Sequence, residues 1–148
     1  MMKTTFLMLF IANFFYGQKC ELDHCFKFGT DSVELIVKNN KCKKVKVPKK
    51  ISTVFFQLIE LEKFDTITKS FINKKKALKD INCIKCNQES TNLKKGKSIV
   101  YSITKNDLWK FNNVIEKGIY RARIHIDVIE FPIGCGSFES ERIDFEIK

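Results

Sequence analysis

The most regular hydrophobic pattern in this chain lies over residues 118–147, near the C-terminal end. Apolar and polar residues alternate over residues 120–128, and the same two-residue period returns over residues 142–147. Such a period is typical of β-strands that bury one face. A proline and two glycines stand between the two runs, so the pattern predicts an antiparallel hairpin with one apolar face.

Shorter apolar segments upstream predict further strands. We expect strands over residues 20–28, 32–38, 53–61, 64–72 and 98–103, and a small alternation through Val45 and Val47. Residues 53–61 are apolar on both sides, which favours a strand covered on both faces. Residues 73–97 hold no period and are expected to form the longest loop. A helical turn is expected to begin near Asn106 or Asp107. The chain is therefore predicted to be all-β, an antiparallel β-sandwich of about seven or eight strands.

The N-terminal end has the layout of a secretory signal peptide. Lys3 gives a basic start, residues 6–15 are almost entirely apolar, and Gly17 is a small residue at a cleavage point. We therefore expect residues 1–17 to be a signal peptide and residues 18–148 to form one secreted or periplasmic domain. This domain is expected to be a monomer without a transmembrane segment. A retained membrane anchor is the alternative, although the apolar run is short for a transmembrane helix.

Charge adds a candidate binding surface, because the chain has a formal net charge of +10 and its lysines are clustered. The clusters lie in residues 41–50, 74–79 and 94–97. The candidate binding residues chosen from them are Lys43, Lys44, Lys46, Lys75, Lys76 and Lys79. A positive patch suits an anionic surface ligand such as an anionic glycan or a lipid headgroup. Nucleic acid is not the expected ligand, because the clusters lack aromatic residues for base stacking and arginine for bidentate phosphate contacts. An ordinary solvated surface is the alternative interpretation.

Six cysteines fall in the predicted mature chain: Cys20, Cys25, Cys42, Cys83, Cys86 and Cys135. An even number of cysteines in an exported protein is typical of disulfides, so all six are disulfide candidates. The spacing of Cys83 and Cys86 also allows a redox pair, but no apolar helical face follows it. A structural zinc site built from Cys42, Cys83, Cys86 and Cys135 is a further alternative. The sequence favours disulfides, with no cofactor and no metal.

The histidines and arginines give no catalytic pattern. His24 and His125 have no serine, cysteine or carboxylate partner at a catalytic spacing, so we expect solvated side chains in cross-strand pairs. Two arginines are expected to form surface ion pairs across the predicted hairpin, Arg121 and Arg123 with Asp144 and Glu146. No catalytic residue is predicted.

Three motifs in the second half resemble small bacterial secreted immunoglobulin-like domains, including those similar to the intracellular proteinase inhibitor type. They are Leu-Lys-Lys-Gly-Lys at residues 93–97, Gly-Ile-Tyr at residues 118–120, and Glu139-Ser140 before a last strand that ends at Ile147. The resemblance covers roughly residues 32–148. It implies an immunoglobulin-like β-sandwich, which is a fold and not an activity.

The resemblance also implies a structural role for Gly118 and Tyr120. In such sandwiches a tyrosine near the start of the penultimate strand turns its hydroxyl back onto the preceding backbone and closes the corner between the sheets. The chain departs from the antibody pattern in two places. Ala122 stands where antibody domains have a cysteine, and Trp109 lies outside the central strand.

The immunoglobulin-like strand order further implies that several loops meet at one end of the sandwich. These loops hold Cys42, the Cys83/Cys86 pair and Cys135, so we expect disulfides there, with Cys42 or Cys135 bonded to the pair. Parts of the three lysine clusters are expected at the same end. The sequence thus predicts an exported, non-catalytic binding or interaction module whose lysine-rich pole meets an unknown protein or an anionic surface ligand. Protease inhibition is one version that the resemblance implies, and a thiol-redox or metal-dependent enzyme using Cys83 and Cys86 is the alternative.

Overall fold

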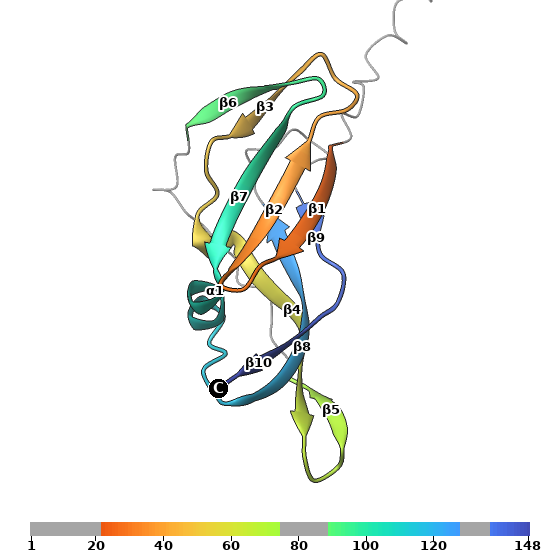
Figure 1. The fold of residues 1–148 in the computed structure, drawn as a ribbon, viewed down its shortest axis with the longest axis vertical. Helices are drawn as coiled ribbons and strands as arrows, with labels where there is room; N and C mark the ends of the chain where they lie inside the picture. Colours follow the sequence, from red (N-terminus) through yellow and green to blue (C-terminus); the bar gives the residue numbers. More distant parts are fainter. Residues whose placement is uncertain (1–21, 75–88, 128–136) are drawn as a thin grey trace, which may run out of the picture.

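The structure is a computed structural model that describes residues 22–74, 89–127 and 137–148, drawn as a ribbon in Figure 1. Antiparallel strands dominate these residues, and the single α-helix among them is α1 (Lys105–Phe111). The prediction of an all-β chain is confirmed. The described parts contain ten strands, more than the seven or eight expected, because several are only three to five residues long.

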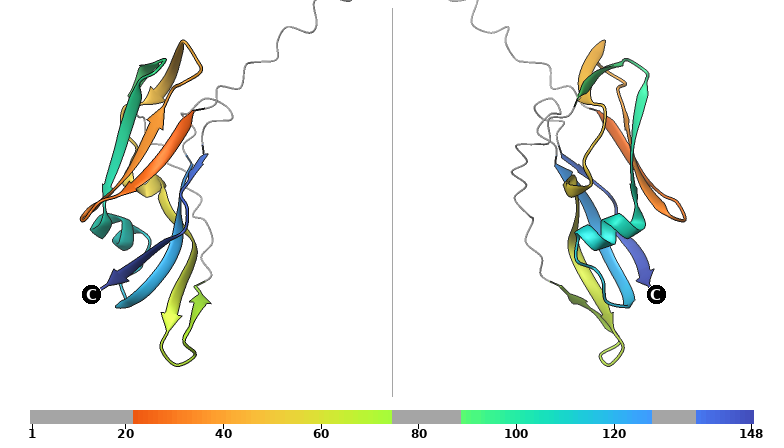
Figure 2. Two further views of the ribbon diagram at one scale, coloured as in Figure 1. Left: turned by 45° about the vertical axis from the view of Figure 1, so that its right-hand side comes forward. Right: turned by 90° about the vertical axis from the view of Figure 1, so that its left-hand side faces the viewer.

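Two antiparallel sheets form the body of the fold. The first has the order β1-β2-β7 and consists of β1 (Asp23–Phe28), β2 (Ser32–Lys38) and β7 (Ser98–Thr104). The second has the order β10-β8-β4-β5, with β9 also paired to β8. Its strands are β4 (Phe56–Asp65), β5 (Ser70–Asn73), β8 (Gly118–Asp127), β9 (Ser137–Glu139) and β10 (Ile143–Ile147). Figure 2 shows these two sheets as separate layers.

A third, two-stranded sheet lies at one end of the molecule. It pairs β3 (Lys44–Pro48) with β6 (Ser90–Lys94), and we call these two strands the lysine ribbon. A short 3-10 helix, η1 (Thr53–Phe55), leads from the ribbon side into β4. In Figure 1 the lysine ribbon and the turn between β4 and β5 lie at opposite ends of the molecule.

The hydrophobic core lies between the two layers and follows the predicted alternation. Every second residue of β2 and of β8 is buried: Val33, Leu35 and Val37 in β2, and Tyr120, Ala122, Ile124 and Ile126 in β8. Phe56 and Leu58 of β4 complete this packing. Full burial of an aliphatic or phenylalanine side chain contributes about 1.5–3 kcal/mol, so these rows supply much of the stability of the fold.

The predicted C-terminal hairpin is present. Strand β8 pairs antiparallel with β10, with Phe145 opposite Tyr120 and Ile147 opposite Gly118. The predicted strand over residues 53–61 begins as η1 and becomes β4 at Phe56. Its first residues, Phe56, Gln57 and Leu58, are all buried, as expected for a strand covered on both faces.

Two predicted segments were wrong. Residues 64–72 form a hairpin instead of one strand, because the Asp65 carboxylate accepts hydrogen bonds from the Ile67 backbone N–H (3.0 Å) and the Thr68 hydroxyl (3.0 Å) and so fixes a turn. The expected loop over residues 73–97 contains β6. This strand has little hydrophobic pattern of its own, since Leu93 is its one buried residue, and it is held by pairing with β3.

Tyr120 makes the backward hydrogen bond expected of it. Its hydroxyl donates to the backbone carbonyl of Glu116 at 2.8 Å, and its ring is buried and stacked on Phe145. Gly118 lies between them with a φ of +149°, a conformation that favours glycine. A Cβ at Gly118 would also come within 2.9 Å of the Lys63 side chain. This corner therefore depends on both residues.

Candidate functional site

The exposed face of the lysine ribbon carries closely spaced positive charges. In the register of β3 and β6, Lys44 lies directly opposite Lys94 and Lys46 lies opposite Asn92. These four side chains are exposed, while Val45, Val47 and Leu93 on the other face are buried. The alternation of the strands thus sorts the apolar residues to the core and the lysines to solvent.

Lys44 and Lys94 occupy one of the ladder positions at which the two opposite side chains lie closer together. The backbone N–H of Lys95 donates to the Lys43 carbonyl (3.2 Å), and that of Lys49 donates to the Glu89 carbonyl (2.7 Å). Hydrogen-bonded pairs alternate with non-hydrogen-bonded ones, so Lys44 and Lys94 form a non-hydrogen-bonded pair. Such pairs bring Cα atoms to about 4.5 Å and side chains closer together. Like charges in directly opposite positions repel and destabilise the ribbon.

No carboxylate belongs to the described strands of the ribbon or to the turns at residues 39–43 and 95–97. The neighbouring acid, Glu89, is engaged by Lys49 at 2.6 Å, and this contact lowers the pKa of Glu89. The charges of Lys44 and Lys94 are therefore not compensated by an acid within their own ladder.

Buried polar groups fix the ribbon to the body. The Asn39 side chain is fully buried, donates to the carbonyls of Cys42 (2.8 Å) and Leu93 (2.9 Å), and accepts from the Cys42 N–H (3.0 Å). At the other end of the ribbon, the Tyr101 hydroxyl donates to the Pro48 carbonyl at 2.7 Å. Burial raises the pKa of Tyr101, so this hydroxyl stays protonated. These bonds anchor the strands that carry the lysines to the body of the fold.

The predicted lysine-rich pole is present only in part. Lys43, Lys44 and Lys46 lie on or beside the ribbon. The cluster at residues 94–97 lies next to them, because Lys94 is opposite Lys44 in the ribbon. Lys74, the described member of the second cluster, lies beyond β5, where its N–H donates to the Leu61 carbonyl (2.7 Å). Candidate residues outside the described residues are Lys75, Lys76 and Lys79.

The structure describes two of the six cysteines. Cys25 is an exposed free thiol, which corrects its prediction as a disulfide candidate. In the register of β1 it lies opposite Ile36, on the face of the sheet turned away from the core, whereas His24 lies opposite the buried Val37. Cys42 is partly buried and packs against the core. The remaining candidates, Cys20, Cys83, Cys86 and Cys135, lie outside the described residues.

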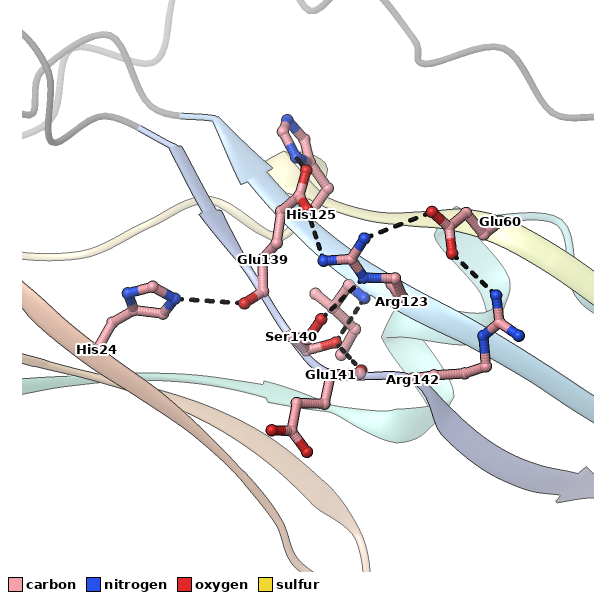
Figure 3. A network of polar contacts seen from close by, with 9 residues as sticks. His24, Glu60, Arg123, His125, Glu139, Ser140, Glu141 and Arg142 are labelled. Carbon is pink, nitrogen blue, oxygen red and sulfur yellow. Dashed lines mark hydrogen bonds and ion pairs between the residues drawn. The ribbon is translucent and has the colours of Figure 1, made fainter.

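Sequence reasoning missed a polar network on β8, β9 and β4, which Figure 3 shows from close by. Arg123 is its centre: its guanidinium lies 2.8 Å from Glu139 and 3.4 Å from Glu60, and its Nε donates to the Ser140 carbonyl at 3.1 Å. Glu60 also lies 3.2 Å from Arg142. Arg123 was predicted to pair with Asp144 or Glu146, whereas its observed partners, Glu60 and Glu139, come from β4 and β9. Arg121 does lie near Asp144, at 3.6 Å.

A bulge in β4 turns Glu60 toward these arginines. The register between β4 and β8 shifts between Ile59 and Glu62, and Glu60 has a φ of +51°. Bulges re-aim a side chain in this way. The hydrogen bond from Arg142, followed by that from Arg123, holds the pKa of Glu60 below its ordinary value of 4.5. The network thus ties three segments of the second sheet together.

The polar groups beside the network are engaged in structural contacts. His125 Nδ1 lies 3.1 Å from Glu139 in a cross-strand pair, with only 13% of its side chain exposed. The Ser140 hydroxyl donates to the Glu141 carbonyl (2.7 Å) and accepts from the Ile124 N–H (2.8 Å). A hollow of about 540 Å³ between β1 and residues 139–143 is lined by His24, Phe26 and Phe28. The exposed thiol of Cys25 also lines this hollow.

Within the residues that the structure describes, no group of three or more histidine, cysteine, aspartate or glutamate side chains is placed to hold a metal ion. In the same residues no helix is both long and apolar enough to span a membrane.

Comparisons with family models, with curated proteins and with solved structures found no match for this chain.

Proposed function

We propose that this chain is an exported, non-catalytic binding module with immunoglobulin-like topology, and that its lysine ribbon binds an anionic ligand. Two features support the topology: the pairing of β2 with β7 and of β4 and β10 with β8, and the hydrogen bond from Tyr120 to the preceding crossover. The export proposal rests on the signal-like composition of residues 1–17.

The observation that carries the binding proposal is the register of Lys44 with Lys94. Two exposed ammonium groups in a non-hydrogen-bonded pair repel each other, and nothing in the packing of the ribbon requires lysine at either position. An anion placed between them would remove this repulsion and gain two ion pairs. The free ribbon is therefore strained electrostatically in a way that an anionic ligand relieves.

The surroundings of this pair favour a polyanionic glycan, sulfated or carboxylated, as the ligand. Lys46 lies one strand period beyond Lys44, about 6.6–6.8 Å along β3, so successive charges of an extended polymer find successive lysines. Asn92 and Ser90 on the same face offer hydrogen bonds to hydroxyl groups. The exposed face of the ribbon presents neither an aromatic ring for base stacking nor a guanidinium for bidentate phosphate binding.

The test is a double charge reversal, Lys44→Glu with Lys94→Glu. This variant keeps two like charges opposite each other, so the repulsion within the ribbon persists while its sign changes. The matched control, Lys105→Glu with Lys148→Glu, changes the net charge equally but on α1 and at the C-terminus. Binding of a fluorescent heparin oligosaccharide is measured by anisotropy at rising salt. We expect the double reversal to weaken binding at least about tenfold and the control to do so much less. Equal losses in both variants, or no binding at low salt, would refute the proposal.

We also propose that Cys42 forms a disulfide with a cysteine outside the described residues. In support, Cys42 packs in a partly buried position next to the ribbon, where a bridge would limit the unfolded chain. Peptide mapping without reduction should find Cys42 linked to Cys83, Cys86 or Cys135. In the same map, the N-terminal peptide of the exported protein should begin at Gln18. Alkylation of Cys42 in the unreduced protein would rule the bridge out. The thiol-redox alternative stays a prediction, since Cys83 and Cys86 are not described.

A further inference from the structure

At the end of the molecule opposite the lysine ribbon, four isoleucine side chains are exposed, and one of them, Ile119, is 48% exposed on β8. Ile67 is 89% exposed in the turn between β4 and β5, Ile115 is 76% exposed in the segment before β8, and Ile72 is 46% exposed on β5. We call these three isoleucines the apolar pole. Residues in exposed turns are usually small or polar, and the geometry of these turns does not demand isoleucine. Their exposure therefore needs another explanation.

Two of the three isoleucines, Ile72 and Ile115, line neighbouring hollows. A hollow of about 500 Å³ is lined by Thr66, Ile72 and Lys74, among others, and a second of about 350 Å³ is lined by Lys74 and Ile115. Lys74 borders both hollows, so the two adjoin. Ile67 follows Thr66 at the rim of the first. Figure 1 shows that the β4–β5 hairpin forms the outermost tip of this end.

The turn that carries Ile67 is held in one conformation. Both oxygens of Asp65 are used, one by the Ile67 N–H and the other by the Thr68 hydroxyl, each at 3.0 Å. The Thr68 hydroxyl also lies 2.8 Å from that of Ser70. These contacts lower the pKa of Asp65, so its carboxylate stays ionised and committed to the turn. Ile67 is thus presented to solvent by a pre-organised hairpin.

The charge around the apolar pole is positive. Glu116, a carboxylate of this surface, is neutralised by Lys63 at 2.8 Å, whereas Asp65, whose donors are uncharged, contributes one negative charge. Three further lysines remain around the isoleucines: Lys69 in the turn, Lys74 after β5, and Lys117 before β8. Lysine is depleted at protein–protein interfaces, where aromatic residues and arginine are enriched. Isoleucine tips surrounded by lysines instead suit the boundary between acyl chains and anionic headgroups of a lipid bilayer.

We propose that the apolar pole docks this protein peripherally onto an anionic lipid bilayer. Ile67, Ile72 and Ile115 enter the interfacial region, and Lys69, Lys74 and Lys117 contact the anionic headgroups. The lysine ribbon, at the other end, is left free for its own ligand. This interaction is independent of the function proposed for the ribbon.

The experiment compares binding to vesicles of phosphatidylcholine alone with binding to vesicles that also contain phosphatidylglycerol. The full mature chain should co-sediment only with the anionic vesicles, and the variant Ile67→Ser with Ile115→Ser should bind at least about tenfold more weakly. Val100→Ser is the matched control, because Val100 is a half-exposed apolar residue on the outer face of the first sheet. That control should bind like the wild type. A tryptophan introduced by Ile67→Trp should shift its emission to shorter wavelength on binding.

The same assay separates this surface from the lysine ribbon. Lys44→Glu with Lys94→Glu should leave vesicle binding intact; if that variant abolishes binding and the serine variant does not, lipid contacts the ribbon and the inference fails. Self-association that the serine variant abolishes, without vesicle binding, would assign the apolar pole to a second copy of the chain. Absence of vesicle binding by the wild type would also overturn the inference, whatever the ribbon binds.

Discussion

Lys44 lies directly opposite Lys94 in the antiparallel register of β3 and β6, and both side chains are exposed. The next pair of the ladder, Val45 and Leu93, is buried and anchors the two strands, so the backbones of the two lysines stay opposite each other. The strands therefore hold together two charges that repel. A ligand that bridges these charges stabilises the ribbon, whereas the free protein retains the repulsion.

Removal of this repulsion should change stability and ligand affinity in opposite directions. Lys44→Glu places a carboxylate opposite Lys94, and opposite charges in such a pair contribute about 0.2–1 kcal/mol. We expect the free energy of unfolding, measured in urea, to rise by that amount while the affinity for a sulfated oligosaccharide falls. A fall in both quantities would mean that Lys44 serves the fold and not a ligand.

Asn39 should be the most sensitive polar residue of the ribbon. Asn39→Ala leaves the carbonyls of Cys42 and Leu93 and the N–H of Cys42 without their side-chain partner. Because an unsatisfied buried group costs about 1–3 kcal/mol, we expect a loss of about 2–4 kcal/mol in urea denaturation. The neighbouring exposed Asn40, which bonds Asp23 at the surface, is the control. Asn40→Ala should cost less than about 0.5 kcal/mol, and similar losses in the two variants would contradict this role for Asn39.

The corner at Tyr120 gives a second stability prediction. Tyr120→Phe removes only the hydrogen bond to the Glu116 carbonyl, so the expected loss is about 0.5–1.5 kcal/mol. Gly118→Ala should cost more, because the backbone at φ +149° disfavours alanine and the new Cβ meets the Lys63 side chain. Thermal denaturation of both variants tests this order. A stability of Tyr120→Phe equal to that of the wild type would show that the corner is held by ring packing alone.

Acid should weaken the network around Arg123 through Glu60. The pKa of Glu60 is lowered in the folded protein, first by Arg142 and then by Arg123, so the folded state binds the Glu60 proton less readily than the unfolded state. The stabilisation is therefore complete above the ordinary value of 4.5 and is lost as the pH falls below it. Glu60→Gln should flatten the decline of unfolding free energy below about pH 4.5, while stability at neutral pH falls only slightly. If the unfolding free energy of Glu60→Gln declined below about pH 4.5 as steeply as that of the wild type, protonation of Glu60 would not be coupled to folding.

The parts of the fold that the sequence predicts are those whose pattern is local. Strand β8 buries every second residue, from Tyr120 to Ile126, and a two-residue period reveals this without tertiary information. Strand β6 has no such pattern, since Leu93 alone is buried, and its conformation comes from pairing with β3. The turn at Asp65 was missed because the residues that follow it, Thr66, Ile67 and Thr68, are β-branched and favour a strand.

The candidate sites depend still more on contacts between distant residues. The lysine clusters are visible in the sequence, but the pairing of Lys44 with Lys94 requires the register of two strands that lie far apart in the chain. In the sequence, Asn39 is only a residue that ends a strand. Its hydrogen bond to the Leu93 carbonyl is visible only in the folded chain. Glu60 meets Arg123 only because β4 bulges, and no glycine or asparagine in the sequence signals that bulge.

The most direct test of the proposed function is the salt dependence of binding for the wild type and for Lys44→Glu with Lys94→Glu. A fluorescent heparin oligosaccharide is titrated with each protein at several salt concentrations. We predict that the wild type binds at low salt, that its affinity falls steadily as salt rises, and that the double variant loses both the affinity and the salt dependence. Retention of wild-type affinity by the double variant would contradict the assignment of the lysine ribbon as the anion-binding surface.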